Sequence, residues 1–147
     1  MVLQAKEIMD PNFLAVDEGI DALACARRMV AARKGYAVLT RPGTATIAGI
    51  VTEWDYLEKI VAQARRPEET PVRSIATAEV QSCAPDTPTD EVATAMGSLG
   101  IRRMVVRSGD QVVGVISSRQ VISIFRQYVD RLTAQIAGYQ VGANPPG

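Results

Sequence analysis

The chain of 147 residues has no histidine and only two cysteines. Without histidine it lacks the side chain that most often acts as a general base near neutral pH, and this excludes the usual Ser-His and Cys-His forms of catalysis within one chain. Cys25 and Cys83 stand alone, without the Cys-x-x-Cys spacing of a zinc site, so we expect two small buried hydrophobic residues and no metal. No nucleophile and base can be paired from these residue types, so the sequence predicts that the protein is not an enzyme.

Aromatic residues and net charge are also scarce. Only 5% of the residues are aromatic against 47% hydrophobic, so the core should be built from Val, Ile, Leu, Ala and Met. The 16 basic residues balance the 16 acidic ones, which leaves no overall field to attract nucleic acid or an anionic membrane. Residues 26–34 form a basic helical face but bring no aromatic platform for stacked bases, and nucleic-acid binding is not expected.

Long hydrophobic runs are missing as well. No segment approaches the roughly 18 consecutive apolar residues that indicate a membrane span, and the first residues lack the apolar stretch of a signal peptide. We therefore expect a cytoplasmic protein without a membrane segment. The length fits one ordinary domain with a core of useful size.

The sequence contains one seven-residue motif in two related copies. GIVTEWD occupies residues 49–55, and GVISSRQ occupies residues 114–120, with Gln120 where the first copy has Asp55. The matching residues lie 65 apart here and 67 apart further upstream. The slip of two falls in a predicted turn between strands, where insertions are tolerated. The chain is therefore an internal duplication.

Both copies predict the same order of elements. In the first copy, hydrophobic periodicity and β-rich runs predict a short strand at 14–16, a helix at 20–33, strands at 36–41 and 46–52, and a helix at 53–64. In the second copy they predict a short strand at 80–83, a helix that is capped by Thr87, starts with Pro88 and ends near Leu99, strands at 102–107 and 111–117 around a Ser108-Gly109-Asp110 turn, and an amphipathic helix at 118–136.

This order predicts an α/β fold of the α+β sandwich kind with two small three-stranded sheets. The expected organisation is a first repeat at 1–65, a polar connector with two prolines at 66–74, a second repeat at 75–137 and a flexible tail at 138–147. Neither repeat alone buries enough surface to be stable. We therefore expect the two repeats to pack against each other.

The duplicated pattern resembles a pair of CBS domains, the unit called a Bateman module. Each copy is led by a segment such as AKEIM and runs through helix, strand, turn and strand to Gly, two apolar residues and Ser or Thr. The resemblance covers residues 5 to about 126, although residues 72–80 lack the Met and Pro of the usual lead-in. It implies two repeats, each with a three-stranded sheet and two helices, packed in pseudo-two-fold symmetry.

Thr52 and Asp55 are the candidate ligand residues. Thr52 lies between a predicted strand and a predicted helix, where free backbone N–H groups and the helix dipole favour an anion. Asp55 follows one turn later with a carboxylate that can accept two O–H donors from a vicinal diol. The same residues also form an ordinary helix start, with Thr52 as N-cap and Asp55 as the acid at the third position. Spacing alone leaves both alternatives open.

The resemblance implies a role for each of these positions. In CBS domains the aspartate grips ribose and the threonine region faces phosphate, which corresponds here to Asp55 and Thr52. It also implies basic phosphate contacts, a hydroxyl in the second copy and residues that cover the purine: Arg102, Arg103, Arg119, Ser117, Val80 and Gln81. The implied ligand-binding set is completed by a weaker second site at Leu14, Ala15 and Gln120, since Gln120 can hydrogen-bond ribose but carries no charge.

The resemblance implies a regulatory ligand-sensing module that requires no cofactor. The expected regulatory ligand is an adenine nucleotide (AMP, ADP or ATP) or an adenosyl compound, and the regulated protein partner is not identified. Family members commonly dimerise through the helices after the second strands, here 53–64 and 118–136, so a homodimer is expected. Trp54 is expected to pack at the inter-repeat or dimer surface.

The alternative is a structural or oligomerisation module without a bound small molecule. Gln120 favours it, because the second copy has lost the acid. Tyr36 favours it too, because Tyr36 stands where the first copy would supply its own basic residue, and a multiply charged phosphate chain is then expected to bind less tightly.

Overall fold

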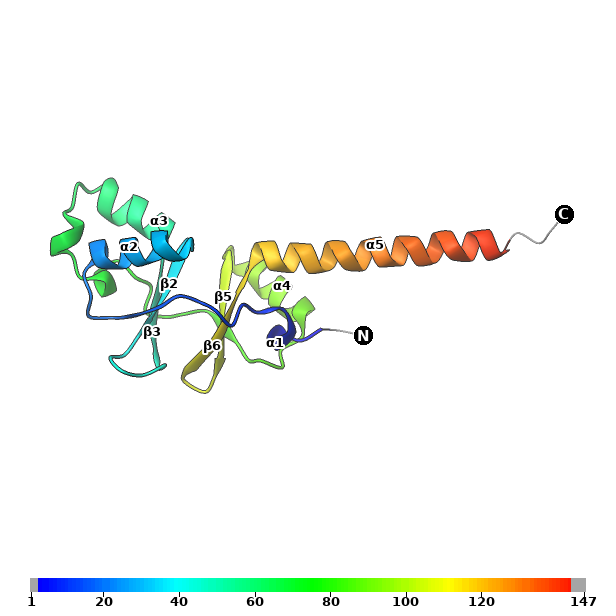
Figure 1. Ribbon diagram of the computed structural model, residues 1–147, viewed down its shortest axis with the longest axis horizontal. Helices are drawn as coiled ribbons and strands as arrows, with labels where there is room; N and C mark the ends of the chain where they lie inside the picture. The colour runs from blue at the N-terminus through cyan, green and yellow to red at the C-terminus, as the bar shows by residue number, and fades with distance from the viewer. Residues whose placement is uncertain (1–2, 144–147) are drawn as a thin grey trace.

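A computed structural model describes residues 3–143, and the side chains of residues 3–138, as two three-stranded sheets that lie side by side with helices around them (Figure 1). In the first sheet, β1 (Ala15–Asp17) runs parallel to β2 (Tyr36–Thr40), and β2 pairs antiparallel with β3 (Ile47–Thr52). The second sheet repeats this order with β4 (Ser82–Cys83), β5 (Arg103–Ser108) and β6 (Gln111–Ser117). The predicted fold class of two small mixed sheets with helices is confirmed.

The helix that precedes the central strand of each sheet ends in the left-handed region. α2 (Ala22–Ala32) is capped by Asp21, whose Oδ1 accepts a hydrogen bond from the N–H of Ala24 at 2.8 Å. α4 (Thr89–Leu99) ends at Gly100 with φ 65°, the conformation that favours glycine at this position. The predicted start of α4 is wrong by one residue, because Pro88 is itself the N-cap and the hydroxyl of Thr87 instead accepts from the N–H of Ala84.

The helices that follow the third strands differ in length. α3 (Glu53–Tyr56) continues as the π-helical segment η1 (Leu57–Val61), in which the N–H of Ala62 reaches the carbonyl of Leu57. The helix predicted at 53–64 is therefore shorter and wider than expected.

α5 (Ser118–Ala143) is instead longer than predicted. Residues 138–143, expected in a flexible tail, are helical, while residues 144–147 of that tail lie outside the described part. α5 projects well beyond the sheets (Figure 1). Within residues 3–143, no helix is both long and apolar enough to cross a membrane.

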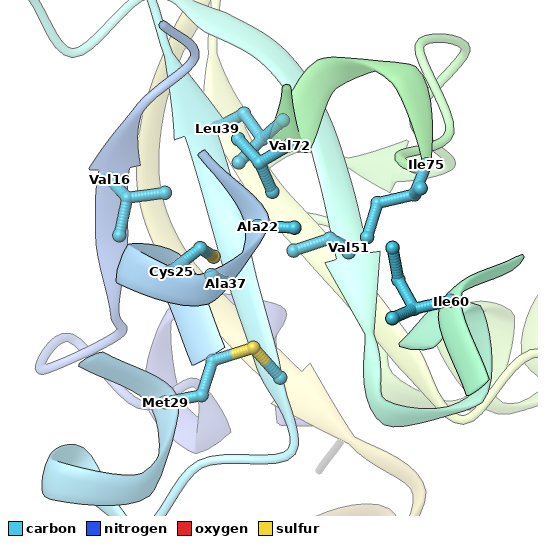
Figure 2. Close-up of a cluster of buried hydrophobic side chains, with 10 residues drawn as sticks. All are labelled: Val16, Ala22, Cys25, Met29, Ala37, Leu39, Val51, Ile60, Val72 and Ile75. Carbon is cyan, nitrogen blue, oxygen red and sulfur yellow. The ribbon is translucent and has the colours of Figure 1, made fainter. Parts of the chain in front are cut away.

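Each lead-in segment packs against the other repeat. Ile8 of α1 (Ala5–Ile8) is buried in the core of the second repeat, beside the side chains of α4, β5 and β6. The expected connector instead forms the 3-10 turns η2 (Pro67–Glu69) and η3 (Val72–Ser74). Figure 2 shows Val72 and Ile75 together with Leu39 and Val51 in the core of the first repeat. The boundary predicted at residue 75 therefore does not separate the two cores.

The repeated glycine provides room for this exchange. A Cβ on Gly114 would lie within 3.0 Å of three side-chain atoms of Met9, and a Cβ on Gly49 would lie 3.0 Å from the carbonyl oxygen of Thr77. Close to each glycine, the backbone of the lead-in segment forms a β-bridge to the third strand of the other repeat. These bridges join Asp10 to Val115 and Thr77 to Ile50. The glycine of the duplicated motif is therefore explained by the close approach of a lead-in segment, through the side chain of Met9 at Gly114 and through the backbone of Thr77 at Gly49.

A third apolar cluster joins the two sheets. Its buried members come from both repeats: Tyr36, Val38, Val105, Val112 and Val115. At the hairpin tips, Thr46 and Gln111 form a β-bridge. Cys25 is fully buried in the first core, as predicted, whereas Cys83 is only half-buried. Burial raises the pKa of both thiols.

Candidate functional site: two clefts between the repeats

Two clefts lie where the third strand of one repeat meets the helix and strand of the other. The first has a volume of about 660 Å³ and combines the end of β3 and α3 with residues 77–81 and 100–103. The second has a volume of about 730 Å³ and combines the end of β6 and the start of α5 with Asp10 and residues 33–36. Most lining positions of one cleft match those of the other at the repeat spacings of 65 and 67.

The predicted site residues divide between these clefts. Four line only the first cleft: Thr52, Asp55, Val80 and Gln81. Three line only the second: Ser117, Arg119 and Gln120. Arg102 and Arg103 line both. Ser117 and Arg119, expected with the main ligand-binding set, thus lie in the second cleft and not beside Asp55.

Leu14 and Ala15 are not brought to the second cleft. The side chain of Leu14 packs against the first core, and Ala15 begins β1, where its carbonyl accepts from Arg28 at 3.3 Å. Neither of the two residues expected to cover a purine in the second cleft therefore lines it. At the repeat spacing of 67, the structural counterparts of Val80 and Gln81 are Phe13 and Leu14, and Phe13 does not line this cleft either.

Asp55 lies in the first turn of α3 and is buried, with 8% of its surface exposed. Its Oδ2 accepts hydrogen bonds from the backbone N–H of Thr52 at 2.9 Å and from the Thr52 hydroxyl at 3.2 Å, and together the two residues form a capping box. Its Oδ1 accepts from Nζ of Lys59 at 3.0 Å. A carboxylate offers about four acceptor positions, so one remains open while Lys59 stays in place.

Lys59 was missed by sequence reasoning. It lies four residues after Asp55, a spacing that places two side chains on one helical face, and this spacing could have indicated the pair. Its Nζ also donates to the carbonyl of Ile75 at 2.9 Å. That second bond connects the candidate ribose carboxylate to the lead-in segment of the second repeat.

Gln120 repeats the capping geometry of Asp55 in the second cleft. Its Oε1 accepts from the N–H of Ser117 at 2.7 Å and from the Ser117 hydroxyl at 3.2 Å. The loss of the acid therefore leaves the helix start intact. What the second copy lacks is the charge, not the cap.

Arg103 lies at the boundary of the clefts between two side chains of the first repeat. Its Nη2 is 3.6 Å from Oε1 of Glu53, and its guanidinium lies 5.5 Å from the centre of the Tyr36 ring, a cation–π contact. Gly35 permits this packing, because a Cβ there would lie 2.7 Å from Nη2 of Arg103. Burial, and next the nearby charge of Asp10, raise the pKa of Tyr36 to about 12.

The CBS domain model matches residues 5–62 and 72–127. The chain belongs to the CBS-domain family. Its two repeats form a CBS pair, and CBS domains generally serve regulation rather than catalysis.

Similar proteins agree with this assignment. The mitochondrial CBS domain-containing protein CBSX3 of Arabidopsis thaliana is 33% identical over 111 residues, which cover 71% of this chain. The match spans 54% of that relative, so this chain corresponds to about half of its length.

Two solved structures share both fold and some sequence. A putative signal-transduction protein with CBS domains from Burkholderia ambifaria MC40-6 is 26% identical with a TM-score of 0.76, covering 84% of this chain and 93% of that one. A CBS domain protein from Pyrobaculum aerophilum, solved as a complex with AMP, is 26% identical with a TM-score of 0.74, covering 80% and 89%.

The two clefts of this CBS pair differ in charge. The first is lined by three carboxylates and two guanidinium groups: Glu53, Asp55, Glu79, Arg102 and Arg103. The second is lined by two carboxylates and five basic side chains: Asp10, Glu53, Arg33, Lys34, Arg102, Arg103 and Arg119. The carboxylate suited to ribose therefore lies in the less basic cleft, which the sequence did not indicate.

Some of the other residues that line the clefts were not predicted, although the internal repeat could have indicated them. Asp10, Arg33 and Lys34 are the repeat counterparts of Thr77, Gly100 and Ile101, so either cleft predicts the other. No local pattern indicates that Glu53 faces Arg103, because these residues lie 50 positions apart in different repeats.

Trp54 lines the first cleft and is 63% exposed. It therefore does not pack at the inter-repeat surface, which was one of its two expected positions; the other was a dimer surface. Among residues 3–143, no group of three or more candidate metal ligands is present.

Proposed function

We propose that this CBS pair is a regulatory module that senses an adenosine-containing ligand in the first cleft. The observation that carries the proposal is the buried carboxylate of Asp55 in an inter-repeat cleft with apolar walls at Ile50, Val80 and Ile101. A ribose diol can donate to this carboxylate while the purine lies against the apolar walls. The complex of the Pyrobaculum aerophilum relative with AMP supports this class of ligand.

The charge of the cleft favours a short phosphate or none. Arg102 and Arg103 can meet one phosphate group, and the planar guanidinium suits paired oxygens. Glu53 already pairs with Arg103, and Glu79 adds a further negative charge to the same cleft. We therefore expect AMP and uncharged or cationic adenosyl compounds to bind more tightly there than ATP.

The second cleft is expected to attract anions more strongly and ribose less strongly. Its five basic side chains favour phosphate, but Gln120 offers a neutral amide in place of the carboxylate. A ligand in the first cleft would signal through a homodimer or through a protein partner.

The test compares AMP with 2′-deoxy-AMP by calorimetric titration of the wild type and Asp55→Asn. The wild type should bind AMP more tightly than the deoxy compound, and Asp55→Asn should remove most of this difference, because the discrimination comes from hydroxyl donors to the carboxylate. Gln120→Ala is the control in the other repeat, since it changes the corresponding position of the second cleft and should keep the discrimination. Equal losses in the two variants would contradict the assignment of Asp55.

A second candidate function is a structural module that binds no small molecule. One observation favours it: three of the roughly four acceptor positions of Asp55 are already used by Thr52 and Lys59. Thermal melting with AMP, ADP, ATP, methylthioadenosine and S-adenosylmethionine distinguishes the two. A ligand present at about one hundred times its dissociation constant adds about 2.7 kcal/mol to the free energy of unfolding, so melting curves that none of the five compounds moves would favour the structural module.

A further inference from the structure

The C-terminal part of α5 carries an exposed apolar stripe that its own repeat does not cover. Val121 and Ile124 near the start of the helix pack into the core of the second repeat. The stripe lies on another face and consists of five exposed side chains: Ile122, Phe125, Val129, Leu132 and Ile136. From residue 125 to residue 138 every side chain of α5 is exposed, as expected for a helix that projects from the body (Figure 1).

The stripe follows a heptad. Its spacings are three, four, three and four residues, which is the period of a coiled-coil seam rather than of a helix that lies on a globular core. Ile122, Val129 and Ile136 then occupy position a, and Phe125 and Leu132 occupy position d. All three residues at position a are β-branched. In parallel coiled coils, β-branched residues at a with leucine at d favour two strands.

We propose that two copies of this chain associate through a parallel, in-register coiled coil of α5 that extends from Ile122 to Ile136. In this arrangement each residue at a or d meets its own counterpart, so apolar side chains meet apolar side chains throughout. Within the seam, Arg126 and Thr133 occupy the flanking position e, and Tyr128 and Gln135 occupy the flanking position g. Of these four residues, Arg126 alone is charged. The seam therefore offers no complement to a charged partner helix and brings no row of like charges together between two copies.

The interface area favours the parallel orientation. The stripe is about 21 Å long and a helix is about 10 Å wide, so the seam alone covers far less than the roughly 800 Å² per partner of a standard interface. A parallel pair places both bodies at the same end of the seam, where they can contribute further contacts, whereas an antiparallel pair places them at opposite ends. Ile122, the first seam residue, also lines the second cleft, so the seam begins at the edge of a candidate ligand site.

The family resemblance implies only that the helix at 118–136 takes part in a dimer, whereas the heptad spacing adds the register and the parallel orientation. The CBS model ends at residue 127, and Val129, Leu132 and Ile136 lie after that boundary. The proposal does not depend on ligand binding, so the two can fail separately.

Sedimentation equilibrium of the purified chain tests the association. The wild type should be a dimer, and Val129→Asp should weaken dimerisation at least tenfold, because a carboxylate at position a would be buried against its counterpart. Gln127→Asp is the matched control, since the same charge at position f lies on the opposite face of the helix and should leave the dimer intact. A monomeric wild type, or equal behaviour of the two variants, would overturn the proposal.

Disulfide formation tests the orientation. In a chain with Cys25→Ala and Cys83→Ala, a cysteine introduced as Leu132→Cys at position d should give a covalent dimer under mild oxidation, since a parallel seam brings the two copies of position 132 together. Ala134→Cys at position f should remain uncrosslinked. Covalent dimers from position 134 rather than 132, or no covalent dimer from either position, would contradict the parallel seam, whatever the effect of Val129→Asp on folding.

Melting shifts with AMP should persist in Val129→Asp, and this separates the seam from the ligand proposal.

Discussion

At the scale of single residues, the carboxylate of Asp55 serves the helix start and the candidate ligand site with the same oxygen atoms. Thr52 holds Oδ2 through both its N–H and its hydroxyl, and Lys59 holds Oδ1. A ribose diol brings two donors, whereas about one acceptor position is open. We therefore expect ligand binding to compete with the ammonium group of Lys59 rather than with the cap, because the cap is fixed by backbone geometry.

Replacing Lys59 by methionine tests this competition. The variant keeps most of the aliphatic side chain but removes the donor, so the carboxylate can accept both ribose hydroxyls. Charge-assisted hydrogen bonds contribute about 1.5 to 3 kcal/mol, and regaining part of one should tighten AMP binding by about tenfold in calorimetric titration. Lys34→Met, which removes a cation from the second cleft, should leave this affinity nearly unchanged. Weaker binding in Lys59→Met would show that Lys59 assists the ligand instead.

The ion pair of Asp10 with Lys34 should make stability depend on pH. The hydrogen bond from Lys34 is the main cause that lowers the pKa of Asp10 below its ordinary value. A carboxyl whose pKa is lower in the folded state stabilises the fold above its unfolded pKa of about 3.9, and this contribution disappears as the pH falls through the folded value.

Urea unfolding of the wild type and of Asp10→Asn measures this contribution. The difference in the free energy of unfolding should be largest near neutral pH and should shrink as the pH falls below about 4. A difference that stays constant down to the acid limit would mean that the side chain stabilises the fold by its shape rather than by its charge.

At the scale of secondary-structure elements, the order of helices and strands could be predicted because it depends on local periodicity and turn residues. Gly100 and the Ser108-Gly109-Asp110 turn are examples in which a local conformation fixes the boundary. The partners of the lead-in segments could not be predicted, since the pairing of Asp10 with Val115 joins residues more than one hundred positions apart. The end of α5 was also missed, because the helix continues through Gly138 despite the low helix propensity of glycine.

The same division applies to the candidate site. Thr52 and Asp55 could be placed together in one cleft because a single helical turn connects them. Arg119 was assigned to the main site because arginines recur at phosphate sites, yet its position after β6 places it in the second cleft. Which repeat supplies which wall depends on how the two sheets face each other, and the local pattern carries no information on this.

Replacing Gly114 by alanine tests the contact between a lead-in segment and the third strand. The new Cβ would lie 2.4 Å from Sδ of Met9, so the segment must shift or the methionine must change its rotamer. We expect a loss of about 1 to 3 kcal/mol in the free energy of unfolding, as is typical of overpacking. Part of this loss should be recovered when Met9→Ala is added, which gives a coupling energy in a double-mutant cycle.

Gly97→Ala is the control for this experiment. Gly97 is exposed in α4, and nothing lies within 4 Å of the position that a Cβ would occupy. There the substitution should raise stability by about 0.5 to 1 kcal/mol, because alanine favours helix more than glycine does. A Gly114→Ala variant as stable as the wild type would remove the proposed reason for the repeated glycine.

At the scale of the whole molecule, the exchange of lead-in segments makes each core depend on both halves of the sequence. Ile8 is buried with the strands of the second repeat, and Val72 and Ile75 are buried with those of the first. A ligand that binds between the repeats therefore contacts two bodies that are already connected by two crossing segments. Such a module is expected to respond as one unit rather than as two repeats that open independently.

Ile8→Ala tests this coupling, because the residue lies at the start of the first repeat in sequence but belongs to the second core. We expect a loss of about 2 to 5 kcal/mol, as for other large-to-small core substitutions. In a Cys83→Ser background, the thiol of Cys25, which is fully buried in the first core, reports on that core by its reactivity, while circular dichroism reports on the whole chain. Both signals should shift to the same lower denaturant concentration, since coincident transitions indicate one cooperative unit. If Cys25 stays protected after the remaining structure has melted, the repeats unfold separately and the coupling through the lead-in segments is too weak to join the two cores.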